Sequence, residues 1–371
     1  MTVFWDVGAL RPDMSPLPGD AHADLCIVGL GGSALTAAVE AARRGMNVVA
    51  VDADRIAAGA AGRNGGFMLA GIAMFHHDAV ARFGRGVAAA MYQRTLEEMA
   101  RVERDQPNVF RRCGVLRAAV DDAEFQDCVA HRDALVADGF AGDLHSGAQG
   151  RGLLIPTDGV FHPVRRAVLL ADQAMRAGAR LHTATRVTSV EPGAVHTEHG
   201  TVTARHILVA LDGGLARVLP VLHDQVRDVR LQMVATAPTE ARLPMPVYAR
   251  HGYDYWQQHA DGSVTIGGGR DVAGASEDTS DSSPTSVVRD YLERTLRDLG
   301  VHSPVTHHWA ATVGYTDCGL PVVTEALPGV WAIGGYCGTG NIVGALLARG
   351  IVELLDSGAS GAIADFQAAR A

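Results

Sequence analysis

The chain has 371 residues, of which 47% are hydrophobic and 20% are charged, a composition typical of a globular protein long enough for two domains. Its formal net charge is −9 and it has no block of like charges, so we expect neither a nucleic acid nor a membrane as its partner. Five cysteines form no C-x-x-C pair, which argues against a disulfide framework and a metal site and favours a cytoplasmic protein.

Residues 1–22 are expected to form an irregular extension ahead of the first strand. They combine charged side chains such as Asp6, Arg11 and Asp13 with three prolines, and they lack the apolar core of a signal peptide. We therefore expect no export.

A strand, a glycine turn, a helix and a second strand are predicted in succession after this extension. The apolar run Leu25–Val28 opens into the G-x-G-x-x-A turn of residues 29–34. A helix follows over Thr36–Arg44, and a strand over Asn47–Val51 ends at Asp52. This order of elements predicts a Rossmann-type dinucleotide site.

Each part of that turn has a chemical role in the predicted site. Gly29 allows the tight turn, and Gly31 lets backbone amides approach a pyrophosphate without a side chain in the way. The helix N-terminus adds about half a positive charge. Asp52 is placed to accept hydrogen bonds from a ribose diol and would repel a 2′-phosphate, so FAD or NAD is favoured over NADP.

A second loop of small residues follows at 59–66, and it decides between the two dinucleotides. Its last five residues, GRNGG, resemble the SGRNGG motif of the D-amino-acid oxidase/glycine oxidase superfamily, in the gamma-glutamylputrescine oxidase-like branch. Ala61 stands where that family has serine. The resemblance implies FAD, with Arg63 and Asn64 near its pyrophosphate and ribityl chain.

The middle of the chain carries fewer signals. Two helical patterns between residues 82 and 139 flank a short strand at 114–120, and the nearby Arg111, Arg112 and Arg117 are interpreted as a solvated strand edge. An amphipathic helix over Val164–Ala177 and a strand over Arg180–Val190 come next.

The cofactor is expected to meet the next two segments as well. The resemblance places Val187 beside the adenine. A hairpin over 195–203 precedes the strand 206–210, and the resemblance places Ala210, at the end of that strand, beside FAD.

From residue 226 to 269 apolar and polar residues alternate in short segments, which predicts an antiparallel sheet. A helix with Pro284 in its first turn follows. The chain then returns to the cofactor with residues 334–341, which resemble the family's GGYxGTGN motif. Ala326–Ala348 carries no charge and is long enough to span a bilayer, but its glycines and Pro328 favour a strand, a loop and a buried helix.

The resemblance implies an α/β fold, with a glutathione-reductase-like FAD-binding Rossmann domain and an inserted antiparallel-sheet substrate domain. The expected parts are the extension 1–22, the FAD-binding domain 23–80, 150–222 and 322–371, a helical bridging segment 81–149, and the substrate domain 223–321.

Seventeen residues are expected to contact FAD, which we expect to be bound without a covalent link. They are Gly29, Gly31, Gly32, Ser33, Asp52, Arg63, Asn64, Gly65, Gly66, Val187, Ala210, Gly335, Gly338, Thr339, Gly340, Asn341 and Ile342.

The substrate is expected to meet side chains of the antiparallel sheet. Tyr253, Tyr255 and Trp256 are candidate walls for an amine cation, and Arg270 or Arg250 is a candidate anchor for a carboxylate. Each aromatic residue is equally well explained as cross-strand packing.

Two departures from the family restrict the chemistry. The substrate-gripping arginine that glycine-oxidase-like members carry in the segment matching residues 308–315 is missing here. Monomeric sarcosine oxidases use a lysine to activate oxygen and a cysteine to bind flavin covalently. This chain has no lysine at all, and Val313 takes the cysteine position.

The resemblance implies FAD-dependent oxidation of a C–N bond in a small amine or amino acid by hydride transfer to the flavin, with oxygen as the acceptor. A flavin dehydrogenase that acts on an amine or imine-forming metabolite, for example in a biosynthetic pathway, and passes electrons to another acceptor fits the same motifs. A nicotinamide-dependent oxidoreductase fits only the first motif.

Overall fold

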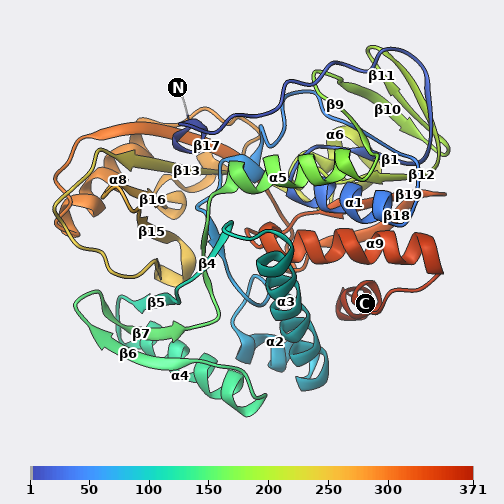
Figure 1. Cartoon of the computed structure of the whole chain (residues 1–371). Helices are drawn as coiled ribbons and strands as arrows, with labels where there is room; N and C mark the ends of the chain where they lie inside the picture. The colour runs from blue at the N-terminus through green and yellow to red at the C-terminus, as the bar shows by residue number, and fades with distance from the viewer. Residues whose placement is uncertain (1–2, 371) are drawn as a thin grey trace.

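The computed structural model describes residues 3–370, which fold into two large sheets, one small sheet and the helices around them (Figure 1). The helices are α1 (Gly32–Arg43), α2 (His76–Phe83), α3 (Arg85–Asp105), α4 (Asp122–Ala137), α5 (Pro163–Arg176), α6 (Leu215–Val218), α7 (Arg270–Ala273), α8 (Ser286–Asp298), α9 (Ala345–Ser357) and α10 (Gly361–Arg370).

The first large sheet has a parallel centre, β12-β1-β2-β9, extended by antiparallel strands at its rim. Its strands are β1 (Ala21–Val28), β2 (Val48–Val51), β9 (Arg180–His182), β10 (Val187–Glu191), β11 (Ala194–Thr197), β12 (Gly200–Val209), β18 (Val322–Leu327) and β19 (Val330–Gly334). Strand β19 also pairs in parallel with β12, and β10, β11 and β18 are the antiparallel strands. Helix α1 contacts both α5 and α9, and the three cover one face of this sheet (Figure 1). The arrangement confirms the predicted Rossmann-type fold.

The second large sheet has the order β17-β13-β16-β15-β14-β5-β7-β6, and all its pairs except β14–β5 are antiparallel. Its strands are β5 (Val115–Ala119), β6 (Asp143–Gly147), β7 (Gly150–Ile155), β13 (Arg227–Thr236), β14 (Val247–Ala249), β15 (Asp254–Gln258), β16 (Val264–Gly267) and β17 (Val305–Tyr315). The small third sheet holds β3 (Phe67–Met68), β4 (Phe110–Arg112) and β8 (Gly159–Phe161).

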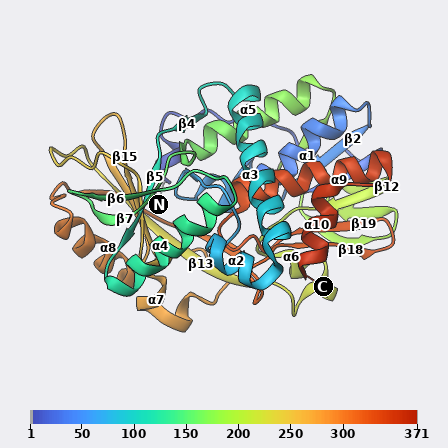
Figure 2. The same ribbon diagram turned by 90° about the horizontal axis from the view of Figure 1, so that it is seen from below.

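The antiparallel sheet predicted from residue 226 onward is therefore present, and it is wider than the sequence indicated. Three further strands, β5, β6 and β7, join it from before residue 156 (Figure 2). The interpretation of Arg117 as part of a solvated strand edge was wrong, because β5 is paired on both sides and Arg117 is only partly exposed.

Two predicted elements have different bounds. The strand expected over Arg180–Val190 is two strands, because Ala184 takes a left-handed φ of 45° between β9 and β10. The helix expected to include Pro284 begins at Ser286, since Thr285 is still extended and its N–H donates to Gln232 Oε1 at 2.7 Å.

The N-terminal extension is more ordered than predicted. Residues Phe4–Asp6 form a 3₁₀ turn, and Trp5 is only 2% exposed. Its indole Nε1 donates to the backbone oxygen of Asn64 at 2.8 Å. The extension therefore packs against the loop that carries the GRNGG sequence.

The uncharged stretch Ala326–Ala348 contains the end of β18, β19, a π-helical turn at Gly340–Gly344 and the start of α9. Within residues 3–370 no helix combines the length and the apolar character needed to cross a membrane.

Candidate active site

A cavity of about 920 Å³ lies between the two large sheets, and fourteen of the seventeen predicted cofactor residues line it. The exceptions are Gly66, Val187 and Gly335. The tyrosines Tyr253 and Tyr255 and the arginine Arg270 line the same cavity. The three glycine-rich segments thus share one space with three of the five candidate substrate residues.

The first turn is built for close approach of the backbone. Gly29 has a φ of 112°, and a Cβ there would lie 2.8 Å from the Ala210 carbonyl oxygen at the end of β12. Helix α1 begins at Gly32 with no side-chain cap, so its first N–H groups remain free to bind an anion.

Asp52 follows β2 and is held by two backbone donors. Its carboxylate accepts from the Leu30 N–H at 2.8 Å and from the Asp54 N–H at 2.9 Å. Burial raises the pKa of Asp52, and these two donors oppose that shift. Each oxygen keeps further lone-pair capacity, so an oriented carboxylate remains available to a diol.

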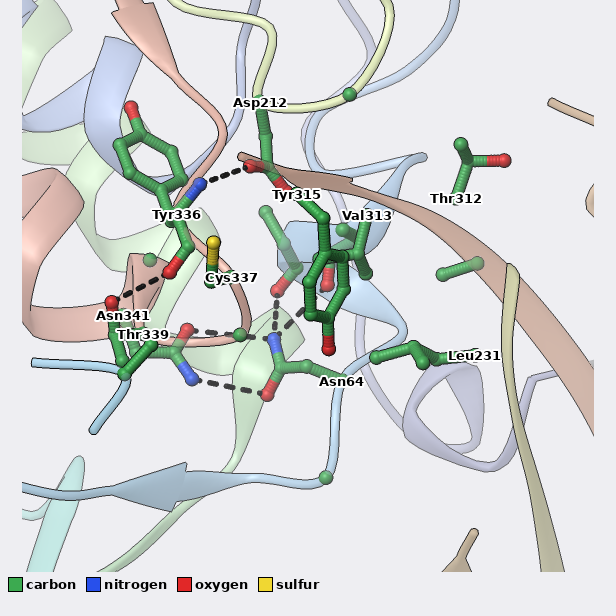
Figure 3. Close-up of a pocket in the computed structure, with 18 of the residues that line it drawn as sticks. Asn64, Asp212, Leu231, Thr312, Val313, Tyr315, Tyr336, Cys337, Thr339 and Asn341 are labelled. Atoms are coloured by element: carbon green, nitrogen blue, oxygen red, sulfur yellow. Dashed lines mark hydrogen bonds between the residues drawn. The ribbon is translucent and has the colours of Figure 1, made fainter. Parts of the chain in front are cut away.

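Asn64 and Asn341 join the second loop to the closing loop, although 277 residues separate them (Figure 3). Their side-chain amides lie 3.4–3.5 Å apart. Asn64 also donates to the carbonyl of Ala61 at 3.0 Å, and Asn341 donates to that of Phe67 at 3.0 Å. Asn64 therefore shapes its own loop, as does Asn341, and their contact fixes one loop against the other.

Two arginines connect these loops to neighbouring elements. Arg166 is buried and donates to the Asn341 carbonyl at 2.9 Å, and burial lowers its pKa to about 10. Arg63 donates to the Ala310 carbonyl of β17 at 3.2 Å, while its buried Nε has no partner among residues 3–370. Arg63 therefore connects the loop to the second sheet and retains one unused donor.

The second sheet presents an aromatic wall to the cavity. Tyr255 stacks on Tyr248 of the neighbouring strand, with ring centroids 5.3 Å apart and planes at 20°. Phe67 meets the Tyr248 ring edge to face at 4.8 Å. Trp256 does not belong to this wall: it is 7% exposed and packs in the core on the opposite face, because successive strand residues point to opposite sides.

The two candidate anchors have different environments. The Arg270 guanidinium carbon lies 4.9 Å from the Tyr253 ring centroid and 4.7 Å from that of Tyr315. Arg250 is engaged elsewhere: it contacts Asp254 at 3.1 Å, the Tyr291 hydroxyl at 2.5 Å, and Asp271. Arg250 was therefore a wrong candidate.

Residues 24–354 match the family model described as FAD dependent oxidoreductase. The chain belongs to this family. It is 29% identical over 367 residues to "Probable oxidoreductase OrdL" of Rhizobium meliloti (strain 1021), covering 89% of this chain and 82% of that protein. It is 26% identical over 363 residues to "Gamma-glutamylputrescine oxidoreductase" of Escherichia coli (strain K12), covering 90% and 83% of the two chains.

Solved structures show the same fold at low sequence identity. Glycine oxidase from Geobacillus kaustophilus gives a TM-score of 0.73 at 19% identity, over 90% of this chain and 95% of the other. L-proline dehydrogenase from P. horikoshii gives 0.74 at 18% identity, over 93% and 96%.

The cavity of this FAD-dependent oxidoreductase fits its cofactor. The free helix N-terminus suits a pyrophosphate, Asp52 suits a ribose, and the Gly338–Asn341 loop reaches the part of the cavity that faces the second sheet (Figure 3). Bound FAD supplies a two-electron acceptor that the amino-acid side chains lack. The protein supplies position, exclusion of water and electrostatics.

Three residues that the sequence analysis did not assign to the site also line the cavity. Tyr315, at the end of β17, projects its ring toward Asn64 (Figure 3). Asp212 follows β12 with a left-handed φ of 56°, accepts from the Tyr336 N–H at 3.0 Å, and has its pKa raised to about 6 by burial. Arg117 comes from β5. Arg117 has no sequence signal, because only strand pairing brings it to the cavity, whereas Asp212 lies two residues after Ala210 and Tyr315 ends the segment 308–315.

Proposed function

We propose that this FAD-dependent oxidoreductase oxidises a C–N bond in a small amine or amino acid, that the hydride passes to the flavin, and that oxygen accepts the electrons. The observation that carries the proposal is the position of Arg270 in the wall of the cavity, between two tyrosine rings. The name of one relative, a gamma-glutamylputrescine oxidoreductase, agrees with an amine substrate.

Arg270 has the features of an anchor for a carboxylate. Its guanidinium lies over the faces of Tyr253 and Tyr315, which leaves the N–H groups at its edge unblocked. Among residues 3–370 it forms no salt bridge with a carboxylate. A planar arginine with a free edge can bind a carboxylate through two parallel hydrogen bonds.

A neighbouring network holds the segment that carries Arg270 in place. Asp254 accepts from the Gly269 N–H at 3.3 Å and from the Tyr291 hydroxyl at 2.5 Å. Arg250 joins the same group through Asp271, on the first turn of α7 beside Arg270. Arg250 therefore acts as a positioning residue for the anchor.

A dehydrogenase that uses another acceptor is the second candidate, and the absence of lysine favours it. Lysine is the residue that sarcosine oxidases place beside the flavin to activate oxygen, and the sequence contains none. Oxygen uptake with an amine panel should exceed reduction of a quinone or dye acceptor if the protein is an oxidase. Turnover with the dye alone would favour the dehydrogenase.

We also propose that FAD is held without a covalent bond. Val313 lines the cavity where sarcosine oxidases have their cysteine. The Cys337 sulfur accepts from the Thr316 N–H at 3.4 Å. Acid precipitation should release the yellow chromophore into the supernatant, whereas colour that stays in the pellet would overturn this proposal.

A further inference from the structure

Arg117 belongs to a row of paired residues that runs across the second large sheet and includes two tyrosines of the aromatic wall. It is paired with Tyr248, Tyr248 with Tyr255, and Tyr255 with Gly267, across four neighbouring strands. Residues paired in this way share a face of the sheet. Arg117 and Tyr255 therefore face the same side, and both line the cavity.

The row separates two arginines. Arg117 lies at the β5 end, and Arg270 follows three residues after Gly267 at the β16 end. Three strand spacings amount to roughly 14 Å between the Cα atoms at the two ends of the row. The two tyrosine rings occupy the space between them.

Arg117 lacks a direct counter-ion in the described part of the chain. Its buried Nε has no hydrogen-bond partner there, and its guanidinium carbon lies 5.7 Å from the Phe75 ring centroid. No carboxylate among residues 3–370 forms a salt bridge with it, although its charge acts to lower the pKa of the buried Asp158 carboxyl. Burial raises the pKa of Asp158 to about 7, so this carboxyl is only partly ionised at neutral pH.

A partly buried cation without an anion is unfavourable, and an incoming anion relieves that cost. The FAD phosphates do not supply it, because the glycine turn and the start of α1 lie in the other half of the molecule from β5 (Figure 1). The unused donor and the charge of Arg117 therefore remain available to a ligand.

We propose that Arg117 binds a carboxylate at the far end of the substrate, so that the substrate is an elongated amine or amino acid with two acidic groups, one at Arg270 and one at Arg117. This inference rests on the proposed function. The aromatic row between the arginines would contact the chain that joins the two groups.

The test uses simple carboxylates as probes of the FAD-loaded protein. Linear dicarboxylates of four to eight carbons are compared with monocarboxylates of equal length, and dissociation constants are read from the visible spectrum of the bound flavin. At least one dicarboxylate should bind about tenfold or more tightly than its matched monocarboxylate, since a charged hydrogen bond is added. Arg117→Met should remove this preference and leave monocarboxylate binding unchanged.

Arg112→Met is the matched control. Arg112 also influences Asp158, but it is exposed, pairs with Glu103 at 3.0 Å and does not line the cavity. Its loss should leave the dicarboxylate preference intact.

Three results would overturn the proposal. The first is a wild-type protein without dicarboxylate preference at any length, and the second is an Arg117→Met variant that keeps the preference. The third is an Arg117→Met variant that loses thermal stability and binds both probe classes equally worse, with both defects restored by adding Asp158→Asn, because Arg117 would then serve only to neutralise Asp158. These tests read binding alone, so a failure of amine turnover would contradict the proposed reaction and not the role of Arg117.

Discussion

The Arg270 side chain is held in place by its neighbours and can still bind a ligand. Two tyrosine rings lie within 5 Å of its guanidinium, so its long side chain is restrained before any ligand arrives. Its hydrogen-bonding edge contacts no carboxylate of the residues that the structure describes. Little conformational entropy is then lost when a substrate binds, which favours affinity.

Replacing Arg270 by alanine should raise the KM for an acidic amine substrate by roughly 10- to 150-fold, the range expected for loss of a charged hydrogen bond. Flavin content and spectrum should not change. Arg227→Ala is the control, because Arg227 also lies over the Tyr315 ring, at 5.7 Å, but pairs with Asp278 and does not line the cavity. An Arg270→Ala protein with normal flavin content and unaltered KM would refute the anchor.

The role of Asp52 in FAD binding can be tested by a single substitution. Asp52→Arg should weaken FAD binding about tenfold or more, because it removes a charged hydrogen-bond acceptor for the ribose diol and adds a bulky cation. Titration of the apoprotein with FAD measures the effect. Asp224→Arg changes a fully exposed acid by the same charge and should bind FAD normally. Equal FAD affinity of the Asp52 variant and the wild type would contradict the role given to Asp52.

At the scale of elements, strand alternation divides the predicted substrate residues. Tyr255 and Trp256 are neighbours in sequence, yet only Tyr255 faces the cavity. Sequence alone could not choose between them, since a strand with polar and aromatic residues on both faces carries no clear two-residue period. The sequence did not predict that Arg117 lines the cavity for another reason. Its partner Tyr248 is 131 positions away, and no local pattern indicates that pairing.

Gly267 is required by the packing of Tyr255. A Cβ at Gly267 would lie 2.4 Å from the Tyr255 ring, and a Cβ at Gly65 would lie 2.8 Å from the same ring. Gly267→Ala should therefore displace the ring and reduce the free energy of unfolding by about 1–3 kcal/mol, as overpacking does. Urea unfolding of the FAD-loaded protein measures this. Gly86→Ala in α3, where an added Cβ meets nothing within 4 Å, should not destabilise the protein; similar stability of the two variants would contradict the packing argument.

For the whole molecule, the sequence predicted the parts of the cofactor site better than those of the substrate site. The FAD segments are local: the first glycine turn, α1 and Asp52 lie within a few tens of residues, and the closing glycine loop leads directly towards α9. The residues that line the other half of the cavity come from β5, β13–β17 and the segments between them. Their meeting depends on the pairing of strands far apart in the chain, which no single segment encodes.

The cofactor half and the substrate half of the cavity are held together by hydrogen bonds to the loop of residues 62–66. Trp5 donates to Asn64, Trp309 donates to the Arg63 carbonyl at 2.8 Å, and Gln257 donates to the Gly65 carbonyl at 2.6 Å. The loop of residues 62–66 is thus hydrogen-bonded to the second sheet as well as to the FAD-binding half. The candidate substrate residues are therefore positioned relative to the proposed FAD site before substrate binds.

We propose that this protein oxidises a C–N bond with FAD, and anaerobic reduction of the bound flavin distinguishes this reaction from oxidation of a C–O bond. Purified holoenzyme is mixed without oxygen with a panel of amines and amino acids, each paired with the alcohol or hydroxy acid of the same carbon skeleton. We expect the yellow absorbance to bleach with at least one amine, at one substrate equivalent per flavin, and not with its hydroxyl counterpart. Bleaching by the hydroxy compounds alone would contradict the claim.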